Sequence, residues 1–276
     1  VHTTAVGDRH ILKALGDNDW SLGGEQSVSY DGGPFHGFAE NPDVETVAGK
    51  LRQSLEKIIG HEIHLTCAGR TDAGVHAEGQ IISFDAENFD ISKIERSLNK
   101  LCAPFITVSD LQKTNDFFSA RFSATHRTYR YQILNDEYPN PFYHRFTWHV
   151  RTQLDLDSMQ RAAQAVVGEH DFSSFCRKAT ILIDGKEEEA SLTREVISIA
   201  VKSEGSFVEI WVTATSFCHQ MVRSIVGTLV EIGKGRMDES DMSSIISKKD
   251  RNAAGPVAPP QGLTLMEVGY SDPKKQ

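Results

Sequence analysis

One polar, glycine-rich segment carries the residue best placed to do chemistry. Residues 67–80 read Cys-Ala-Gly-Arg-Thr-Asp-Ala-Gly-Val-His-Ala-Glu-Gly-Gln and lie between two stretches that resemble strands. Its three glycines let the backbone turn sharply and approach another molecule closely. Such a loop holds Asp72 beside a sheet edge, where a carboxylate can act on a ligand. An aspartate in a glycine-rich loop also forms turns by accepting its own backbone N–H groups, so the loop alone leaves both interpretations open.

A second segment has the composition of an RNA-binding surface. Between residues 121 and 151 there are five arginines and three histidines against two acidic residues, with aromatic residues interleaved. An RNA backbone and unstacked bases require this combination of cations and rings. A solvated face above an aromatic core has the same composition, so the pattern does not separate the two.

Composition sets wider limits. The chain has 276 residues, 39% hydrophobic and 24% charged, which suffices for one large domain or two ordinary ones with a sizeable core. A net charge of −9 argues against a surface coated with nucleic-acid-binding charge but permits a local basic cleft. No apolar run approaches the roughly 20 residues that span a bilayer, and no secretory pattern opens the chain. We therefore expect no membrane partner.

The cysteines and histidines predict neither a disulfide framework nor a metal site. The four cysteines are widely spaced and include no C-x-x-C pair, which favours a reducing cytoplasm. His61, His64 and Cys67 are spaced by three, and residues three apart in a strand point to opposite faces. The sequence thus predicts no bound metal.

Periodicity predicts two α+β units that position the polar segments. Helices are expected at 46–59, 91–101, 157–167 and 217–232, and strands at 63–68, 80–85, 106–111, 127–135, 194–203, 206–215 and 263–270. Residues 1–25 are predicted to form a loosely ordered arm, and 177–191 an exposed loop. The subdomains would then be residues 26–118 and 119–272, each in a ferredoxin-like order.

The last predicted helix has a polar face distinct from its apolar stripe. His219, Gln220 and Arg223 fall at i, i+1 and i+4, and Gly227 continues that face and leaves room beside it. An arginine there serves either as an ordinary surface residue or as the partner of a buried carboxylate, for which its planar fork is well suited.

Several of these segments together resemble the TruA family of tRNA pseudouridine synthases. The family's central loop matches residues 69–77, its second motif 120–125 with 129–131, and its third 217–227. The opening turn at 30–32 and the tail at 254–265 also match, so the resemblance runs in order from about 30 to about 270. Two segments depart from the pattern. The strand before Tyr30 is less apolar, and Gly37-Phe38-Ala39-Glu40 stands where the family has Gly-Trp followed by glutamines.

The resemblance implies a fold and an activity. The fold would be α+β, a pseudouridine synthase fold of two ferredoxin-like subdomains that share a mixed, mainly antiparallel sheet with flanking helices and a central cleft. The activity would be isomerisation of uridine to pseudouridine in the anticodon stem-loop of tRNA, at tRNA positions 38 to 40, without a cofactor. The family works as a homodimer, whose basic surface would reconcile RNA binding with the charge of −9.

The resemblance also implies roles for individual residues. It makes Asp72 the nucleophile or base, Tyr129 the residue that packs on the target base, and Arg223 the partner of the carboxylate. Whether the carboxylate attacks carbon or acts on a glycosyl species formed by elimination is left open. Contacts with RNA are expected from Arg70, His76, Gln80, Arg121, Arg127, His219 and Gln220.

Two other functions compete with this one. A non-catalytic tRNA-binding or RNA-folding protein on the same scaffold would have no physical need for Asp72, Tyr129 and Arg223 together. A glycoside hydrolase would need a second acidic residue as general acid, and only Asp31 and Glu78 offer one.

Overall fold

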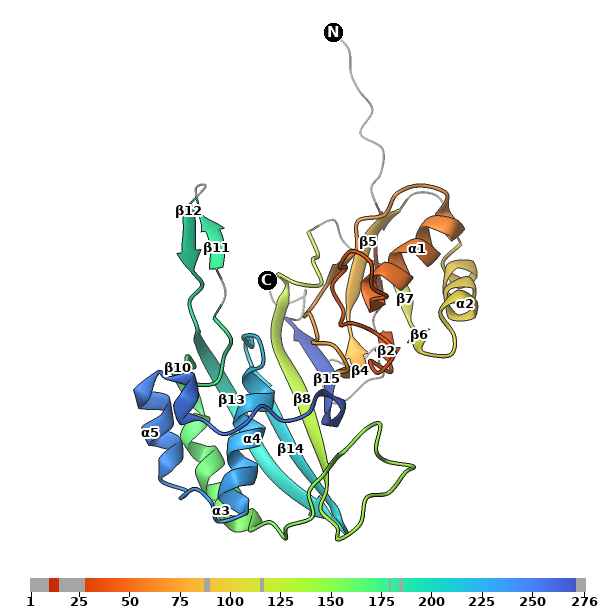
Figure 1. Ribbon diagram of the computed structural model, residues 1–276. Coiled ribbons are helices and arrows are strands. Elements are labelled where there is room, and N and C mark those ends of the chain that lie inside the picture. The colour runs from red at the N-terminus through yellow and green to blue at the C-terminus, as the bar shows by residue number, and fades with distance from the viewer. Residues whose placement is uncertain are drawn as a thin grey trace. The chain divides into compact units, whose positions relative to one another are not determined.

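The chain divides into two compact units in the computed structural model, which describes residues 10–14, 28–86, 90–114, 117–178, 180–183 and 186–271. The first unit is Val1–Thr125 with Met266–Gln276, and the second is His126–Leu265. Strands β8 (Ala124–Leu134) and β15 (Leu263–Tyr270) therefore each contribute residues to both units. The largest sheet in the described residues has nine strands and is mostly antiparallel. The predicted α+β class is confirmed (Figure 1).

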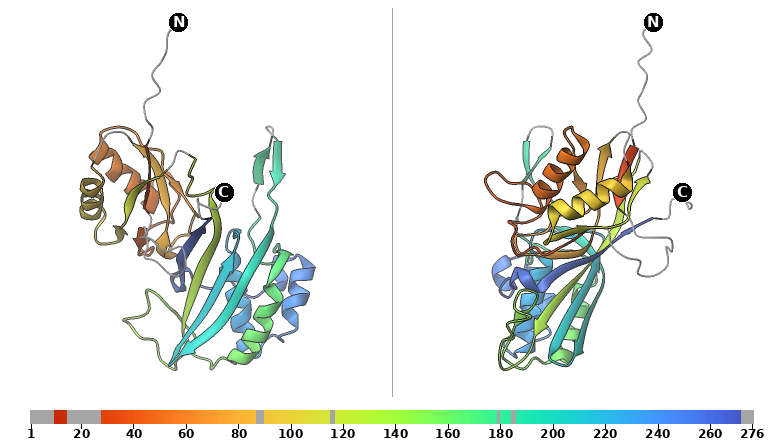
Figure 2. Two further views of the ribbon diagram at one scale, coloured as in Figure 1. Left: turned by 180° about the vertical axis from the view of Figure 1, so that it is seen from behind. Right: turned by 90° about the vertical axis from the view of Figure 1, so that its right-hand side faces the viewer.

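The first unit combines short strands with two helices. In one sheet the order is β3 (Thr66–Cys67), β5 (Ile82–Ala86), β1 (His10–Ala14) and β7 (Leu111–Thr114). In the other, β2 (Val28–Tyr30) pairs with both β4 (His76–Gln80) and β6 (Ile106–Val108). Helices α1 (Val47–Ile59) and α2 (Ile91–Cys102) pack against each other (Figure 2).

Helix α1 forms where its sequence predicts it. Thr46 caps the N-terminus by accepting a hydrogen bond from the Gly49 amide at 3.2 Å, and Gly60 ends the helix in the left-handed conformation, with φ of 91°. The apolar positions Leu51 and Leu55 are fully buried. Propensity, capping and the apolar stripe all agree here.

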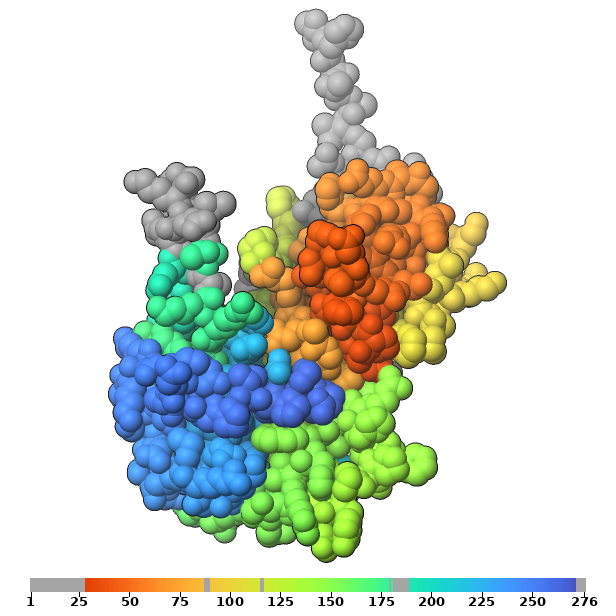
Figure 3. All heavy atoms as spheres, in the orientation of Figure 1, coloured from red at the N-terminus to blue at the C-terminus, as the bar shows by residue number. Residues whose placement is uncertain are grey.

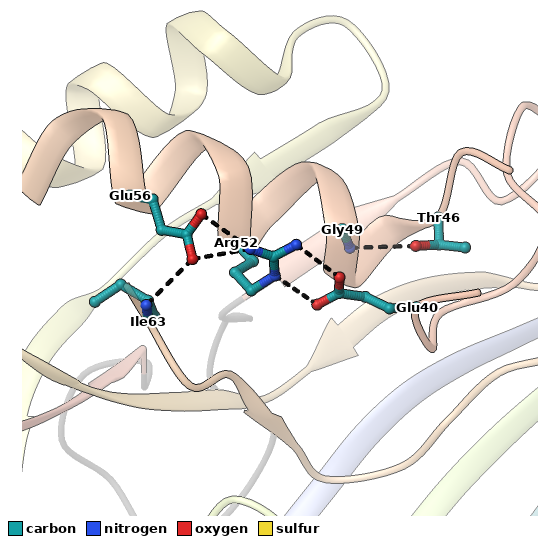
Figure 4. A network of polar contacts seen from close by, with 6 residues as sticks. All are labelled: Glu40, Thr46, Gly49, Arg52, Glu56 and Ile63. Carbon is teal, nitrogen blue, oxygen red and sulfur yellow. Dashed lines mark hydrogen bonds and ion pairs between the residues drawn. The ribbon is translucent and has the colours of Figure 1, made fainter. Parts of the chain in front are cut away.

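An arginine on α1 ties the chain before the helix to the chain after it (Figure 4). Arg52 donates from Nε to Glu40 and from Nη1 to Glu56, both at 2.8 Å. Glu56 also accepts the Ile63 amide at 3.2 Å. Hydrogen bonds from the two carboxylates raise the pKa of Arg52. Glu40, one of the departures from the family pattern, thus has a structural partner.

The second unit places helices on one side of long strands. The strand order is β10 (Gly168–Asp171), β13 (Thr193–Glu204), β14 (Phe207–Ala214), β8 and β15, and β9 (Trp148–His149) pairs in parallel with β8. Helices α3 (Leu156–Ala163), α4 (Met221–Gly233) and α5 (Asp241–Lys248) lie together beside β13 (Figures 1 and 2). Short 3₁₀ helices occupy Gln164–Val166, Arg251–Ala253 and Pro260–Gly262.

The strands predicted at 194–203 and 206–215 form a hairpin in the second unit. Strands β13 and β14 pair in antiparallel register up to Glu204 and Phe207, with Gly205 at a φ of 58° in the turn. Alternate residues of β14 are buried, as the period of two requires.

Three predicted elements differ from the structure. The predicted loop at 67–80 ends in β4, whose mostly polar sequence, His-Ala-Glu-Gly-Gln, gave no strand pattern. The predicted strand at 106–111 is divided into β6 and β7 by Asp110, which has a φ of 55°. Helix α4 begins at Met221, four residues later than 217, because Gln220 has a φ of 66° and leaves the helical region.

Three further segments were assigned too little structure. The loop predicted at 177–191 contains a hairpin of β11 (Thr180–Ile183) and β12 (Lys186–Glu189), since backbone pairing tolerates the charges that suggested a solvated loop. The short helix α5 has only a few apolar residues and was not predicted. Within the predicted arm at 1–25, His10–Ala14 forms β1, and the rest lies outside the described residues.

Among the helices of the described residues, none is both long and apolar enough to span a bilayer.

Candidate active site

Asp72 belongs to the first unit and lies on the loop between β3 and β4, half-buried. The loop is bonded on both sides of it. The Phe38 amide donates to the Thr71 carbonyl at 3.0 Å, and the Val75 amide donates to the Asp72 carbonyl at 3.1 Å. The buried hydroxyls of Tyr30 and Thr71 are 2.8 Å apart and share a hydrogen bond. The backbone that carries the carboxylate is therefore fixed by the fold.

Two glycines let the opening turn approach this loop closely. A Cβ added at Gly32 would lie 2.0 Å from the Val75 carbonyl oxygen. Gly37 has a φ of 98°, and a Cβ there would lie 3.1 Å from the Thr71 carbonyl oxygen. Side chains at these two positions would push the 30–37 segment away from the Asp72 loop.

His76 and Gln80, for which RNA contacts are predicted, are buried on β4. His76 Nδ1 accepts the Gly32 amide at 3.0 Å and lies 3.2 Å from an Asp31 carboxylate oxygen. Gln80 Nε2 donates to the Gly69 carbonyl at 2.7 Å. Both side chains support the loop that carries Asp72, and their contact with RNA stays a prediction.

Arg70 and Arg121, also predicted to contact RNA, are exposed in the same unit. Both lie close enough to Cys67 to act on its thiol. Burial raises the pKa of the Cys67 thiol to about 11, and the positive charges of the two guanidinium groups oppose that rise. The exposed positive charge of this unit thus includes two groups near the Asp72 loop.

Tyr129 belongs to the second unit, on β8, and is 7% exposed. Its ring packs edge-on against Phe217, with centroids 5.1 Å apart. Arg127, two residues earlier on the same face of the strand, donates from Nη1 to the Thr215 carbonyl at 2.9 Å. His219 and Gln220 lie two and three residues after Phe217, and Gln220 is the N-cap of α4.

Arg223 lies on the first turn of α4 and is half-buried. Its Nε donates to the Ala258 carbonyl at 2.7 Å, and the Ala258 amide donates back to the Arg223 carbonyl at 3.0 Å. Residues 254–259, which we call the strap, cross α4 at this point, in the dark-blue chain that runs from α5 to β15 (Figure 1). The strap thereby fixes the base of the guanidinium group.

The strap depends on a glycine of the helix and a tyrosine of the sheet. A Cβ at Gly227 would lie 1.7 Å from the Pro256 carbonyl oxygen, so the room predicted beside Gly227 is filled by backbone. The Tyr131 hydroxyl, fully buried on β8, donates to the Pro259 carbonyl at 2.7 Å. Burial raises the pKa of Tyr131, and the positive charge of Arg223 opposes that rise, so the two groups are near one another.

Two hydroxyl groups of α4 lead to opposite expectations. Thr228 Oγ1 accepts the Gly255 amide of the strap at 2.9 Å. Thr228→Val keeps the shape but leaves that buried N–H unpaired, so the free energy of unfolding should fall by about 1–3 kcal/mol. Ser224 Oγ is buried with no hydrogen-bond partner among the described residues. Ser224→Ala should leave the free energy of unfolding unchanged or raise it by up to about 1 kcal/mol.

Urea unfolding of both variants measures the difference. We expect the midpoint of Thr228→Val to fall below that of the unsubstituted protein and that of Ser224→Ala to stay level or rise. Equal midpoints for the two variants would contradict the hydrogen bond between the strap and α4.

Cys176 and Cys218 are brought together in the second unit, with Cα atoms 5.8 Å apart, a separation that permits a disulfide. The sequence did not predict this pair, because a separation of 42 residues carries no local signal of pairing. The fold brings the two segments together, next to Phe217 and His219. Among the described residues no group of three or more His, Cys, Asp or Glu side chains could hold a metal ion.

The predicted residues thus fall into two groups. The first unit contains Arg70, Asp72, His76, Gln80 and Arg121, and the second contains Arg127, Tyr129, His219, Gln220 and Arg223. The sequence did not single out the supporting groups Tyr30, Thr71 and Tyr131 or the Ala258 carbonyl. Tyr131 could have been found because it shares a strand face with Tyr129, whereas nothing in the sequence indicates a backbone carbonyl.

Comparison with known proteins finds sequence relatives over most of this chain. A family model described as tRNA pseudouridine synthase matches residues 162–271. The tRNA pseudouridine synthase A of Brevibacillus brevis is 41% identical over 246 residues, which is 88% of this chain and 97% of that protein. That of Brucella ovis is 39% identical, covering 90% of this chain and 97% of that protein. The tRNA pseudouridine synthase A 2 of Bacillus cereus is 36% identical, covering 88% and 98%.

A solved structure described as a Cbf5-Nop10-Gar1 complex covers 97% of this chain and 61% of that chain, at a TM-score of 0.35 and 12% identity, which is too weak a likeness to bear on the fold. The sequence relatives, in contrast, are matched over nearly their whole lengths at identities of 36–41%. The chain belongs to the tRNA pseudouridine synthase A family.

Proposed function

We propose that this protein isomerises uridine to pseudouridine in tRNA, at uridines of the anticodon stem-loop (tRNA positions 38 to 40). The observation that carries the proposal is the identity of 36–41%, over 88–90% of this chain, to proteins named tRNA pseudouridine synthase A. The anchored loop that carries Asp72 supports it. The comparisons give no support to a non-catalytic RNA-binding protein on the same scaffold.

The reaction exchanges one glycosidic bond for another. The bond from ribose C1′ to uracil N1 breaks, C1′ joins C5, C5 loses its proton, and N1 gains one. Nothing is oxidised or reduced, so we propose no cofactor. The Asp72 carboxylate either attacks carbon or acts on a glycosyl species formed by elimination, and both routes need the carboxylate charged and held in place.

We propose that Arg223 keeps this carboxylate charged and that Tyr129 packs on the target base. Because Nε of Arg223 is bonded to Ala258, the plane of the guanidinium is fixed, which suits paired hydrogen bonds to a carboxylate. The target uridine has to leave its stack at a cost of a few kcal/mol. Arg70, exposed two residues before Asp72, is the group we propose for the vacated space or the neighbouring phosphate.

Tritium release tests the activity. Transfer RNA that contains uridine labelled with tritium at C5 loses the label to water when C1′ joins C5. We expect release by the unsubstituted protein. Binding of the tRNA without release would overturn the proposal in favour of the non-catalytic alternative.

We also propose that the protein is a cytoplasmic homodimer. The dimer is implied by the resemblance to the TruA family, in which two chains together shape the basic surface; this would reconcile RNA binding with a net charge of −9 per chain. Light scattering at micromolar concentration measures the mass, and a monomer would contradict the dimer. The location is supported by the wide spacing of the cysteines. Because cytoplasmic disulfides are rare, Cys176 and Cys218 should both alkylate in freshly lysed cells.

A further inference from the structure

An exposed aromatic residue of the first unit has no role in the chemistry described so far. Phe122 is 81% exposed and lies just before β8. Single exposed aromatic residues are common on protein surfaces, so exposure alone is no evidence of a ligand. The surroundings of this ring give the evidence.

The ring stands on a turn, residues 119–123, that is bonded at several points. The Ser123 amide donates to the Ser119 carbonyl at 3.0 Å, and the Ser119 amide donates to Ser123 Oγ at 3.1 Å. Between them, Ala120 is fully buried. This turn is therefore closed on itself and does not depend on Phe122 packing into a core.

The same turn is attached to two strands of the first unit. The Ala120 amide donates to Ser83 Oγ on β5 at 3.2 Å, and the Tyr270 hydroxyl on β15 donates to the Ala120 carbonyl at 2.8 Å. The rings of Phe118 and Tyr270 also pack, with centroids 5.1 Å apart. A platform that is rigid before the ligand arrives loses little conformational entropy on binding.

Positive charge accompanies the exposed ring. The guanidinium carbon of Arg121 lies 5.2 Å from the centroid of Phe122, a cation–π distance. Arg121 and Arg70 both act on the thiol of Cys67, so the charge beside Phe122 continues toward the loop that carries Asp72. An exposed ring among cations is what proteins use to hold single-stranded nucleic acid.

We propose that Phe122 stacks on an unpaired base of the tRNA and that Arg121 contacts the adjacent phosphate. The inference rests on the proposed function and extends it, because it names a base other than the target uridine as a binding determinant. Stacking needs no particular base. Phe122 therefore contributes affinity and positioning but does not discriminate among the four bases.

Equilibrium binding of unmodified tRNA to the full-length protein tests the proposal. Phe122→Ala should raise Kd by about 5- to 150-fold, the range that corresponds to the loss of one stacking residue. Phe122→Trp should keep Kd within about twofold, because it preserves the π-face. The thermal midpoint of both variants should not change, since the ring is exposed. An unchanged Kd for Phe122→Ala overturns the proposal.

Phe142→Ala is the matched control. Phe142 is 87% exposed and lies in the long connection between β8 and β9 of the second unit, which protrudes in Figures 1 and 3. Its removal should leave Kd unchanged. An equal loss of affinity in this control would mean that any exposed ring contributes, and would overturn the specific assignment to Phe122.

Two measurements separate stacking from charge. The slope of log Kd against log salt concentration should be unchanged in Phe122→Ala. In Arg121→Gln the slope should decrease by about one, because about one fewer counterion is released on binding. Abasic substitutions at successive loop nucleotides of the tRNA, combined with Phe122→Ala, should reveal one position where the two losses are not additive. Additive losses at every position would overturn stacking on a base.

The outcome for Phe122 is distinguishable from the outcome for the proposed function. Turnover is measured by tritium release and stacking by binding alone. If the unsubstituted protein releases no tritium, the proposed isomerase activity is wrong. The binding measurements still test whether Phe122 stacks on a base. If tritium is released and Phe122→Ala has an unchanged Kd, the proposed stacking by Phe122 is wrong and the proposed isomerase activity is retained.

Discussion

Asp72→Asn should abolish tritium release from C5-labelled tRNA while leaving the Kd for tRNA nearly unchanged. The substitution keeps the size and the hydrogen-bonded loop but removes the charge that either catalytic route needs. Loss of a nucleophile or of its activating group lowers kcat by about 10⁴-fold or more. Affinity should survive because phosphate contacts, made by other residues, dominate RNA binding.

The matched control is Asp85→Asn, an exposed carboxylate on β5 of the same unit. It changes the net charge by the same amount and should leave both rate and affinity unaltered. Turnover by Asp72→Asn near that of the unsubstituted protein would remove Asp72 from the chemistry. A large rise in Kd instead of a loss of kcat would make it a binding residue.

Arg223→Ala should lower kcat by about 10²- to 10⁴-fold. The expectation follows from the pairing with Asp72 that we propose: removing one member of a desolvated ion pair leaves the other charge unpaired, which typically costs about 3–5 kcal/mol. Arg223→Lys should recover only part of the rate, because an ammonium group cannot make the paired contacts of a planar guanidinium. Single-turnover tritium release at saturating protein measures the chemical step for both variants.

Two controls keep this prediction sharp. Arg161→Ala removes an exposed arginine of the same unit, 58% exposed and paired with Glu239, and should not change the rate. The double variant Asp72→Asn with Arg223→Ala should be no slower than Asp72→Asn alone, because the arginine acts through the carboxylate. A further large loss in the double variant, or a normal rate in folded Arg223→Ala, would contradict the pairing.

The sequence predicted best where local preference and burial agree. Helix α1 has a threonine cap, an apolar stripe and a terminal glycine, and it forms as expected. The β13–β14 hairpin combines alternation with a glycine turn, and β15 was predicted residue for residue at 263–270. In these elements local propensity, capping or turn residues, and the pattern of burial all favour the same structure.

The sequence predicted less where tertiary contacts decide. Gln220 has a left-handed backbone conformation, so α4 begins only at Met221, although the apolar periodicity of the sequence begins before that residue. Nothing in residues 254–259 indicates a strap over α4, because its contacts with Arg223 and Tyr131 are made by backbone carbonyls. The central loop was chosen for its polar residues, but the groups that hold it, Tyr30 and Gly32, lie about 40 residues away.

Strand β15 has a consequence for the order in which the molecule is made. Its residues Met266–Tyr270 complete the first unit, where β15 pairs with β4 and passes so close to Gly79 that a Cβ would lie 2.1 Å from the Met266 carbonyl oxygen. In the chain these residues follow the entire second unit. While the ribosome is adding residues 126 to 265, the emerging first unit lacks a strand, and the edge of β4 is open to incorrect pairing. The half of the molecule that is translated first therefore cannot finish folding until the second unit has been synthesised.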